Sequence, residues 1–193
     1  MGWTGIFDVN KNEIRSEVEN IFAHDKISGT NDKRFDILSH STYGSTHYLA
    51  VRDNTDNITR AFIILTHYDS KDNYFMYKDL CEDMGCEFRG APLKILSLLS
   101  DTDNELALQW REEVRNWNMR QSWLKKRLVN GAVIEFNKPI RYSGALPSDT
   151  FTLLKRKSQH GFSLVIPSGG FGRTYRGWKD DIISVDGEKV PTA

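Results

Sequence analysis

Histidines in successive strand-like segments are the residues of this chain best suited to metal or acid–base chemistry. His40, His47 and His67 fall in three such segments, and Asp69 and Asp72 follow the last of them. If His47 and His67 share a face, a site can be built from neighbouring strands. The sequence has no HExxH or comparable spacing, however, and strand histidines often only form hydrogen bonds on a half-exposed face. A metal-dependent enzyme using these histidines and carboxylates is therefore one functional hypothesis.

A run of carboxylates in residues 77–88, YKDLCEDMGCEF, is a second candidate. Nuclease and calcium sites need carboxylates that converge on one point, and this spacing does not match an EF-hand. Two alternatives stay open, a solvated acidic loop and an acidic surface that binds a basic partner. For the second alternative, the predicted partner-binding residues are Asp79, Glu82, Asp83 and Glu87.

Glycines, arginines and aromatic residues are combined in residues 169–178, GGFGRTYRGW. Basic side chains neutralise phosphates and aromatic faces stack on bases, and small β-barrels bind single strands in this way. The same glycines also suit a hairpin turn, in which case the aromatic side chains belong to the core. Both alternatives stay open. The predicted nucleic-acid-binding residues are Lys155, Arg156, Lys157, Arg173, Tyr175, Arg176 and Lys179.

The net charge of zero conceals an asymmetry between the two parts of the chain. Residues 1–110 hold 18 acidic and 11 basic side chains, whereas residues 111–193 hold 8 acidic and 15 basic ones. Such an asymmetry indicates a nucleic-acid or other polyanion surface on the basic part, or two oppositely charged parts that dock on each other.

The first part of the chain has the pattern of a mixed α and β structure. Apolar residues recur at helical spacing in 11–23, and strand-like runs occupy 34–40, 45–52 and 59–67. The polar cluster DNTDN between the last two runs predicts a hairpin, and the apolar run 61–65 predicts a strand covered on both faces. A further strand is expected at 73–77, followed by an irregular acidic stretch at 78–90 and a short helix at 91–100.

A long helix is predicted to follow, beginning with the capping box Thr102–Glu105 and ending at Asn130-Gly131. Glutamates lie in its early turns and lysine and arginine in its late turns, which complements the helix dipole. Its predicted apolar stripe is Leu106, Trp110, Val114, Trp117, Leu124 and Leu128.

After Gly131 the sequence breaks into short strand-like pieces separated by Gly, Pro, Ser and Asp. This texture predicts a small β-barrel or a curled antiparallel sheet. We therefore expect an α+β protein in two parts, a mixed α+β domain at 1–130 that includes an antiparallel sheet and the long bridging helix, and a mostly β unit at 131–193.

Several classes of protein are not expected from the sequence. No apolar run approaches the roughly 20 residues that span a bilayer, and the N-terminus does not resemble a secretion signal, so a cytoplasmic protein without membrane contact is expected. Cys81 and Cys86 cannot form a four-ligand zinc site alone. No nucleophile motif such as GxSxG is present, and we expect no cofactor and no metal.

The opening MGWTG, the run STHYLAV, and YKDLCEDMGCEF followed by PLKILSLLS and ALQWREE resemble a family of small proteins from bacteriophages and conjugative elements of gut Firmicutes and Bacteroidetes. Members begin with Met-Gly-Trp-Thr and carry a Y-K-D-x-x-E-D-M-G motif. The resemblance extends over most of the chain and supplies no catalytic residue. The motif is here Tyr77, Lys78, Asp79, Glu82, Asp83, Met84 and Gly85.

This resemblance implies a setting in which small accessory proteins block host defence by binding rather than by catalysis. The first functional hypothesis is therefore a non-enzymatic inhibitor of a host CRISPR or restriction nuclease, in the manner of an anti-CRISPR, with its acidic part in the nuclease's positive DNA channel. The second is an accessory protein that binds DNA or RNA through the basic C-terminal unit. The sequence leaves the identity of the partner and the oligomeric state open.

Overall fold

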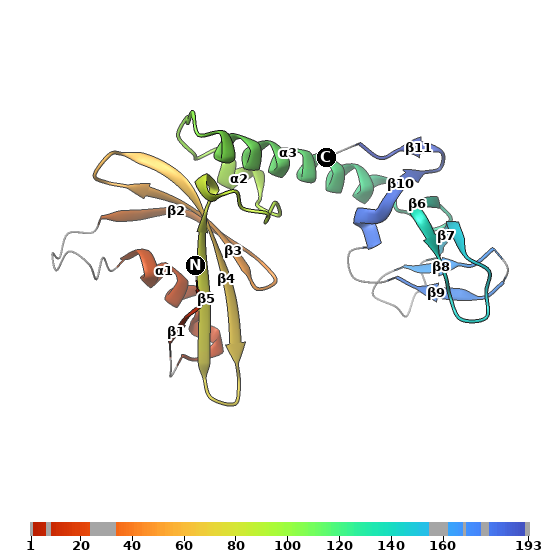
Figure 1. Cartoon of the computed structure of the whole chain (residues 1–193), viewed down its shortest axis with the longest axis horizontal. Helices are drawn as coiled ribbons and strands as arrows, with labels where there is room; N and C mark the ends of the chain where they lie inside the picture. The colour runs from red at the N-terminus through yellow and green to blue at the C-terminus, as the bar shows by residue number, and fades with distance from the viewer. Residues whose placement is uncertain are drawn as a thin grey trace. The chain divides into compact units, whose positions relative to one another are not determined.

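A computed structural model describes residues 2–6, 9–23, 34–154, 162–167, 169–174 and 178–191 (Figure 1). The chain divides into two compact units, residues 1–118 and 119–193, whereas the sequence predicts a division near residue 130. Each unit contains one antiparallel sheet, and helices accompany the first, so the predicted α+β class is confirmed.

The sheet of the first unit has five antiparallel strands in the order β1-β5-β4-β3-β2. The predicted hairpin is confirmed, because β3 and β4 pair along their whole shared length from Thr46↔Leu65 to Asp53↔Ile58. The stretch expected to be irregular from residue 78 instead continues β5 as far as Cys81. The strands are β1 Thr4–Ile6, β2 Phe35–Tyr43, β3 Thr46–Asp53, β4 Ile58–Asp69 and β5 Tyr74–Cys81.

Both faces of this sheet are covered, as the apolar run in β4 predicts. Ile64 lies in one cluster with Val18 and Phe22 of helix α1 (Ile14–Ala23), which follows a 3₁₀ turn at Lys11–Glu13. Ile63 lies in another cluster, with Trp110 of the long helix α3 (Glu105–Arg127) and with Ile95 of the short helix α2 (Leu93–Leu96). Successive β4 side chains therefore alternate between two separate cores.

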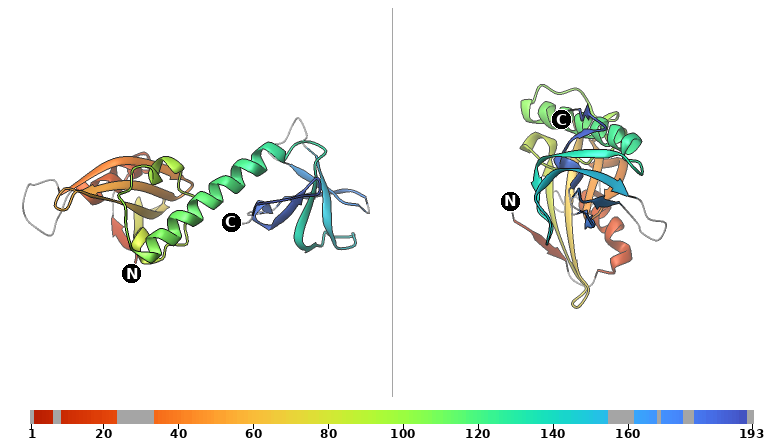
Figure 2. Two further views of the ribbon diagram at one scale, coloured as in Figure 1. Left: turned by 90° about the horizontal axis from the view of Figure 1, so that it is seen from above. Right: turned by 90° about the vertical axis from the view of Figure 1, so that its right-hand side faces the viewer.

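Helix α3 runs without interruption from Glu105 to Arg127 (Figure 2). Its N-cap is Asn104, because the Asn104 side-chain oxygen accepts from the Ala107 N–H at 3.0 Å. The predicted capping box was wrong by two residues: Thr102 Oγ1 accepts from the Asn104 N–H instead. The predicted end of the helix is confirmed, since Gly131 takes the left-handed conformation with φ of 88° shortly after the last turn. Helix α2 is shorter than the predicted 91–100.

The second unit is an open six-stranded antiparallel sheet in the order β11-β10-β6-β7-β8-β9. Of the two forms that the sequence allows, the structure therefore has the sheet and not the closed barrel. A 3₁₀ turn at Trp178–Asp181 precedes β10. The strands are β6 Val133–Ile140, β7 Ser148–Leu154, β8 Ser163–Val165, β9 Phe171–Arg173, β10 Ile182–Val185 and β11 Glu188–Lys189.

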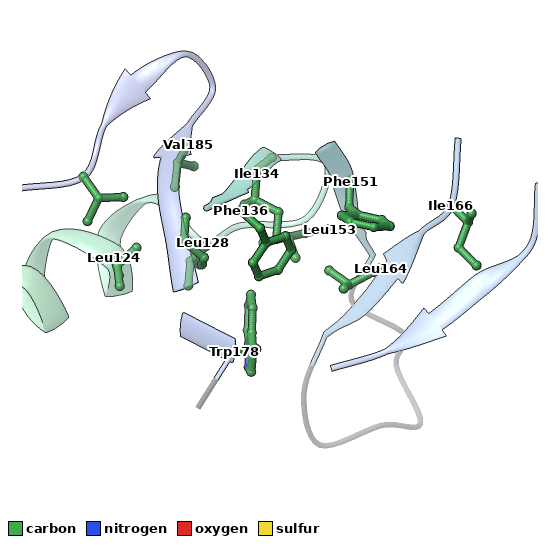
Figure 3. Packing of buried hydrophobic residues seen from close by; sticks show 13 residues of the cluster. Leu124, Leu128, Ile134, Phe136, Phe151, Leu153, Leu164, Ile166, Trp178 and Val185 are labelled. Carbon is green, nitrogen blue, oxygen red and sulfur yellow. The ribbon is translucent and has the colours of Figure 1, made fainter. Parts of the chain in front are cut away.

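The core of the second unit is completed by the last turns of α3 (Figure 3). Leu124 and Leu128 pack with the strand residues Phe136 and Phe151, whose ring centroids are 5.7 Å apart, and with Trp178. Trp178 is thus a core residue, as the hairpin alternative for GGFGRTYRGW predicts. Gly169 and Gly170 have φ of 105° and 91° and form the turn between β8 and β9, which only glycine adopts readily.

Arg120 fastens α3 to the end of the chain within this unit. Its guanidinium donates to the backbone carbonyls of Lys179, Asp180 and Ile182 at 3.1, 3.1 and 2.8 Å, and to that of Pro191 at 3.4 Å. One side chain therefore donates hydrogen bonds to backbone carbonyls of the 3₁₀ turn, of β10 and of the segment after β11.

Candidate functional site

A small cavity lies where the segment after β5 meets the first turns of α3. Its volume is about 110 Å³, and it is lined by Gly85, Cys86, Glu87, Leu106, Gln109, Trp110 and Glu113. Gly85 reverses the chain direction here with φ of 67°. The Trp110 indole N–H donates to the Phe88 carbonyl at 3.1 Å, which holds the segment against the helix. The four α3 residues follow the spacing of one helix face.

Large apolar side chains are exposed on the two segments that line this cavity. Met84 and Phe88 project from the segment after β5, and Leu106 projects from α3 with 46% of its surface accessible. Glu87 lies beside them, and Glu113 accepts from the Gln109 amide at 3.0 Å. We call Met84, Gly85, Glu87, Phe88, Leu106, Gln109 and Glu113 the 84–113 surface. It combines exposed apolar side chains with two glutamates.

A buried ion pair joins the two segments that form this surface. Glu82 is 1% exposed, and its carboxylate accepts from Arg111 Nε and Nη2 at 2.7 and 2.9 Å. It also accepts from the Ala61 N–H at 3.1 Å, while Arg111 Nη1 donates to the Ser100 carbonyl at 2.8 Å. Hydrogen bonding to Glu82 raises the pKa of Arg111. The expectation that Glu82 contacts a partner is therefore corrected, because its carboxylate is enclosed and fully used within the protein.

The other three predicted partner-binding residues do not form one patch. Asp79 pairs in register with Ile64 and so lies on the α1 face of the sheet. Asp83 is half-buried with an oxygen 3.8 Å from Arg60 Nε. Glu87 alone belongs to the 84–113 surface.

Most of the predicted nucleic-acid-binding residues cannot be placed, since Lys155, Arg156, Lys157, Tyr175 and Arg176 lie outside the described residues. Arg173 is exposed on β9. Lys179 is exposed in the 3₁₀ turn, where its carbonyl accepts from Arg120.

His40 and His47 form a pair in the structure. His40 Nε2 lies 2.9 Å from His47 Nδ1, and His40 Nδ1 lies 2.8 Å from the Glu19 carboxylate on α1. With both rings neutral, His40 donates to Glu19 and accepts from His47. Burial lowers the pKa of His40, and burial together with the neighbouring His40 lowers that of His47 to about 4.

His47 and His67 do not share a face, so the condition for a site built from both is not met. The hairpin register places His47 opposite Ile64, so only even-numbered β4 residues share its face. His67 is exposed on the other face, Asp69 ends the strand beside it, and Asp72 lies in the following turn. Within the described parts of the chain, no three His, Cys, Asp or Glu side chains are grouped to hold a metal ion.

The cysteines are not activated for nucleophilic chemistry. Burial raises the pKa of Cys81 to about 11 and also raises that of Cys86. Both thiols are therefore protonated near neutral pH, as inert structural cysteines are.

The sequence did not reveal the apolar part of the 84–113 surface. The helical spacing of α3 assigns Leu106 to the buried stripe, yet Leu106 is exposed in the structure. Met84 and Phe88 lie within the acidic run at 77–88, and these apolar side chains among acidic ones were the available signal.

Residues 101–176 match the model of a protein family described as a domain of unknown function (DUF6927). The match begins just before α3 and ends after β9, so it crosses the division between the two units. Neither the curated proteins nor the solved structures contain a match. Among the described residues, no helix has the length and apolar character needed to cross a membrane.

Proposed function

We propose that this chain is a non-enzymatic protein of a mobile genetic element that binds a defence nuclease in the cytoplasm of its bacterial host and inhibits it. The setting is supported by the resemblance of its opening residues and of the motif at 77–85 to phage and conjugative-element proteins. The binding role is supported by the 84–113 surface, which is the observation that carries the proposal.

The composition of the 84–113 surface is that of a protein contact. Stable interfaces combine an apolar centre with a polar margin, and large apolar side chains exposed together mark such sites. The cavity of about 110 Å³ is well below the roughly 300–1,000 Å³ of pockets for small organic ligands. It suits one apolar side chain that protrudes from a protein partner.

The net negative charge of the first unit is a second observation that supports the proposal. The first unit, residues 1–118, holds 20 acidic and 13 basic side chains, a balance of −7. A nuclease that binds DNA presents a positive channel, and complementary charge accelerates association and excludes wrong partners. Glu87 and Glu113 place part of that negative charge beside the exposed apolar side chains. An acidic protein of this kind competes with DNA for the channel.

The experiment measures DNA cleavage by a panel of purified CRISPR and restriction nucleases in the presence of this protein. We expect the wild type to inhibit at least one of them, and Leu106→Lys to lose inhibition because it places a positive charge among the exposed apolar side chains. The matched control is Leu108→Lys, since Leu108 is equally exposed at 47% but lies on the opposite side of the same helix.

Two results would contradict the proposal. Absence of inhibition across the whole panel would remove the defence nuclease as partner. Equal inhibition by Leu106→Lys and Leu108→Lys would remove the 84–113 surface as the contact.

A further inference from the structure

Two buried histidines of the first unit form a hydrogen-bonded cluster with helix α1. The His40 side chain is 2% exposed, and His47 is 4% exposed. His40 Nε2 lies 2.9 Å from His47 Nδ1, and His40 Nδ1 lies 2.8 Å from the Glu19 carboxylate of α1. On the other side of the His47 ring, Nε2 lies 3.5 Å from Thr66 Oγ1 of β4. A chain of polar groups therefore extends from α1 through β2 and β3 to β4.

This cluster can take up one proton without losing its two short hydrogen bonds. With both rings neutral, His40 donates to Glu19 and accepts from His47. If His40 Nε2 gains a proton while the hydrogen of His47 moves from Nδ1 to Nε2, His40 donates from both ring nitrogens. Its positive charge is then paired with the Glu19 carboxylate, and the His47 Nε2–H faces the Thr66 hydroxyl. One added proton is therefore compatible with the folded geometry.

A second proton is not compatible with this geometry. Once both rings are charged, every ring nitrogen carries a hydrogen, so His40 Nε2–H and His47 Nδ1–H oppose each other across 2.9 Å without an acceptor. Two like charges this close inside a protein repel strongly. The rings cannot separate far along the sheet, because β2 and β3 pair continuously from Ser39↔Ala50 to Tyr43↔Thr46. Relief therefore requires water to enter from the face of the sheet that α1 covers.

In the described residues, the charged groups that face this pair both belong to α1. Glu19 contacts His40, and Arg15 pairs with Glu19 at 3.2 Å and donates to the His40 carbonyl at 3.4 Å. The strands contribute hydroxyl groups as uncharged neighbours, Thr42 on β2 and Thr66 on β4. Protonation of both histidines therefore leaves two uncompensated positive charges at the contact between α1 and the sheet.

Helix α1 is the element of this contact that can leave most easily. In the described part of the chain it shares no backbone hydrogen bond with the sheet, whereas β2 and β3 are joined by their ladder. It has 10 residues, and helices shorter than roughly 12–15 residues are marginal in water without tertiary contacts. The contacts that hold it include the apolar packing of Val18 and Phe22 and the Glu19–His40 hydrogen bond. We therefore expect the helix to open before the sheet does.

We infer that the Glu19–His40–His47 cluster is a proton-operated latch, which holds α1 on the sheet near neutral pH and releases it from an intact sheet when both histidines are protonated. Release uncovers an apolar face that includes Ile64 and Phe75. Burial lowers the pKa of both histidines below the ordinary value of 6.5, so the released state binds protons more tightly and a falling pH favours it. The latch is closed above a pH of about 6.5 and opens as the pH falls toward 4. This inference does not depend on the 84–113 surface.

The test measures amide hydrogen exchange of the full chain by mass spectrometry at pH of about 7 and about 5, with each rate corrected for the intrinsic effect of pH on exchange. We expect α1 to open while the sheet stays closed, so that its amides are at least about tenfold less protected than those of β3 and β4. From the pKa of about 4 for His47 in the folded chain, protection of α1 should fall at least about 20-fold between the two pH values.

A matched pair of variants assigns this pH dependence to the cluster. His47→Gln should abolish most of it in α1, because a glutamine does not titrate. His67→Gln replaces an exposed histidine on the other face of the same sheet and should retain it.

Three results would overturn the inference. Equal protection of α1, β3 and β4 in the wild type would show that the unit opens only as a whole, and this result needs no variant that folds. Protection of α1 that does not change with pH would exclude a proton-operated release. Full pH dependence in His47→Gln would exclude this cluster as its cause. Leu106→Lys should show the α1 exchange of the wild type, so failure of this inference is distinguishable from failure of the proposed function.

Discussion

Arg111 on α3 and Glu82, directly after β5, form a buried ion pair with two hydrogen bonds of 2.7 and 2.9 Å. The pair connects residues that are 29 positions apart and also binds the backbone of β4 through the Ala61 N–H. The Glu82 carboxylate therefore accepts three hydrogen bonds, two of them from its counter-charge, and such bonds allow a buried charge to be tolerated.

Removing one partner of this pair should destabilise the first unit strongly. Arg111→Met leaves the Glu82 carboxylate buried without its counter-charge, and we expect the free energy of unfolding to fall by about 3–5 kcal/mol. Urea unfolding measures the change. The control is Arg60→Met, because Arg60 forms partly exposed pairs with Asp56 and Asp83 that contribute about 0–1 kcal/mol. Similar losses in both variants would contradict the special role of the buried pair.

Acid should destabilise the protein through the buried histidine pair. The pKa of His47 is about 4 in the folded chain and 6.5 as the ordinary value, so the unfolded chain binds more protons between these pH values. The contribution of neutral His47 to the free energy of unfolding is therefore complete above a pH of about 6.5 and declines as the pH falls toward 4. At pH of about 5 the loss from His47 is about 2 kcal/mol.

The measurement is the free energy of urea unfolding across this pH range in wild type, His47→Gln and His67→Gln. Replacing His47 should flatten the pH dependence, because a glutamine does not titrate. Arg15 and Glu19 face the pair from α1, and Thr42 and Thr66 lie near His47 from β2 and β4. Replacing the exposed His67 should leave the dependence unchanged, and a flattening there instead would refute the assignment to His47.

The close approach of Tyr142 to Gly172 should make position 172 intolerant of a side chain. In Gly172→Ala the new methyl group overlaps the Tyr142 ring, so the ring must move and lose its hydrogen bond to the Arg173 carbonyl. We expect a loss of about 1–3 kcal/mol in the free energy of unfolding, as for other overpacked sites. In a Tyr142→Ala background the same substitution should cost much less. Additive losses in this double-mutant cycle would show that the two residues do not interact.

Arg120 should be required for the packing of the chain end against α3. In Arg120→Met several backbone carbonyls lose a charged donor, and hydrogen bonds to charged groups contribute about 1.5–3 kcal/mol. We expect faster amide hydrogen exchange in the 3₁₀ turn, β10 and β11, with little change in β3 and β4. Arg115→Met, an exposed arginine on the same helix, is the control and should leave all of these exchange rates unchanged.

Features encoded by local pattern could be predicted from the sequence. The strand-like runs 45–52 and 59–67 predicted β3 and β4, the polar cluster between them predicted their hairpin, and Asn130-Gly131 predicted the end of α3. The stretch from residue 78 was predicted to be irregular because it is charged. Lys78 and Asp79 are half-buried and exposed, however, and a strand accepts charged side chains at such positions. The cap was misread because both Thr102 and Asn104 are good capping residues, and only the position of the helix decides between them.

The candidate site depended on relations between distant residues, which a single sequence does not reveal. Glu82 and Glu87 belong to the same acidic run, yet one is buried by Arg111 and the other is exposed beside Leu106. Likewise, the faces of His47 and His67 follow from the turn between β3 and β4, because its length fixes which residues stand opposite each other.

Helix α3 belongs to both units, since Trp110 and Val114 complete the core of the first and Leu124 and Leu128 that of the second. During synthesis, the first unit can close only after the chain as far as Val114 has left the ribosome. The second unit then assembles on helical turns that continue from one already anchored, which shortens the search for its own core. A fragment that starts at residue 131 would lack Leu124 and Leu128 and with them part of the core of the second unit, so a cut directly after α3 should not release that unit in folded form.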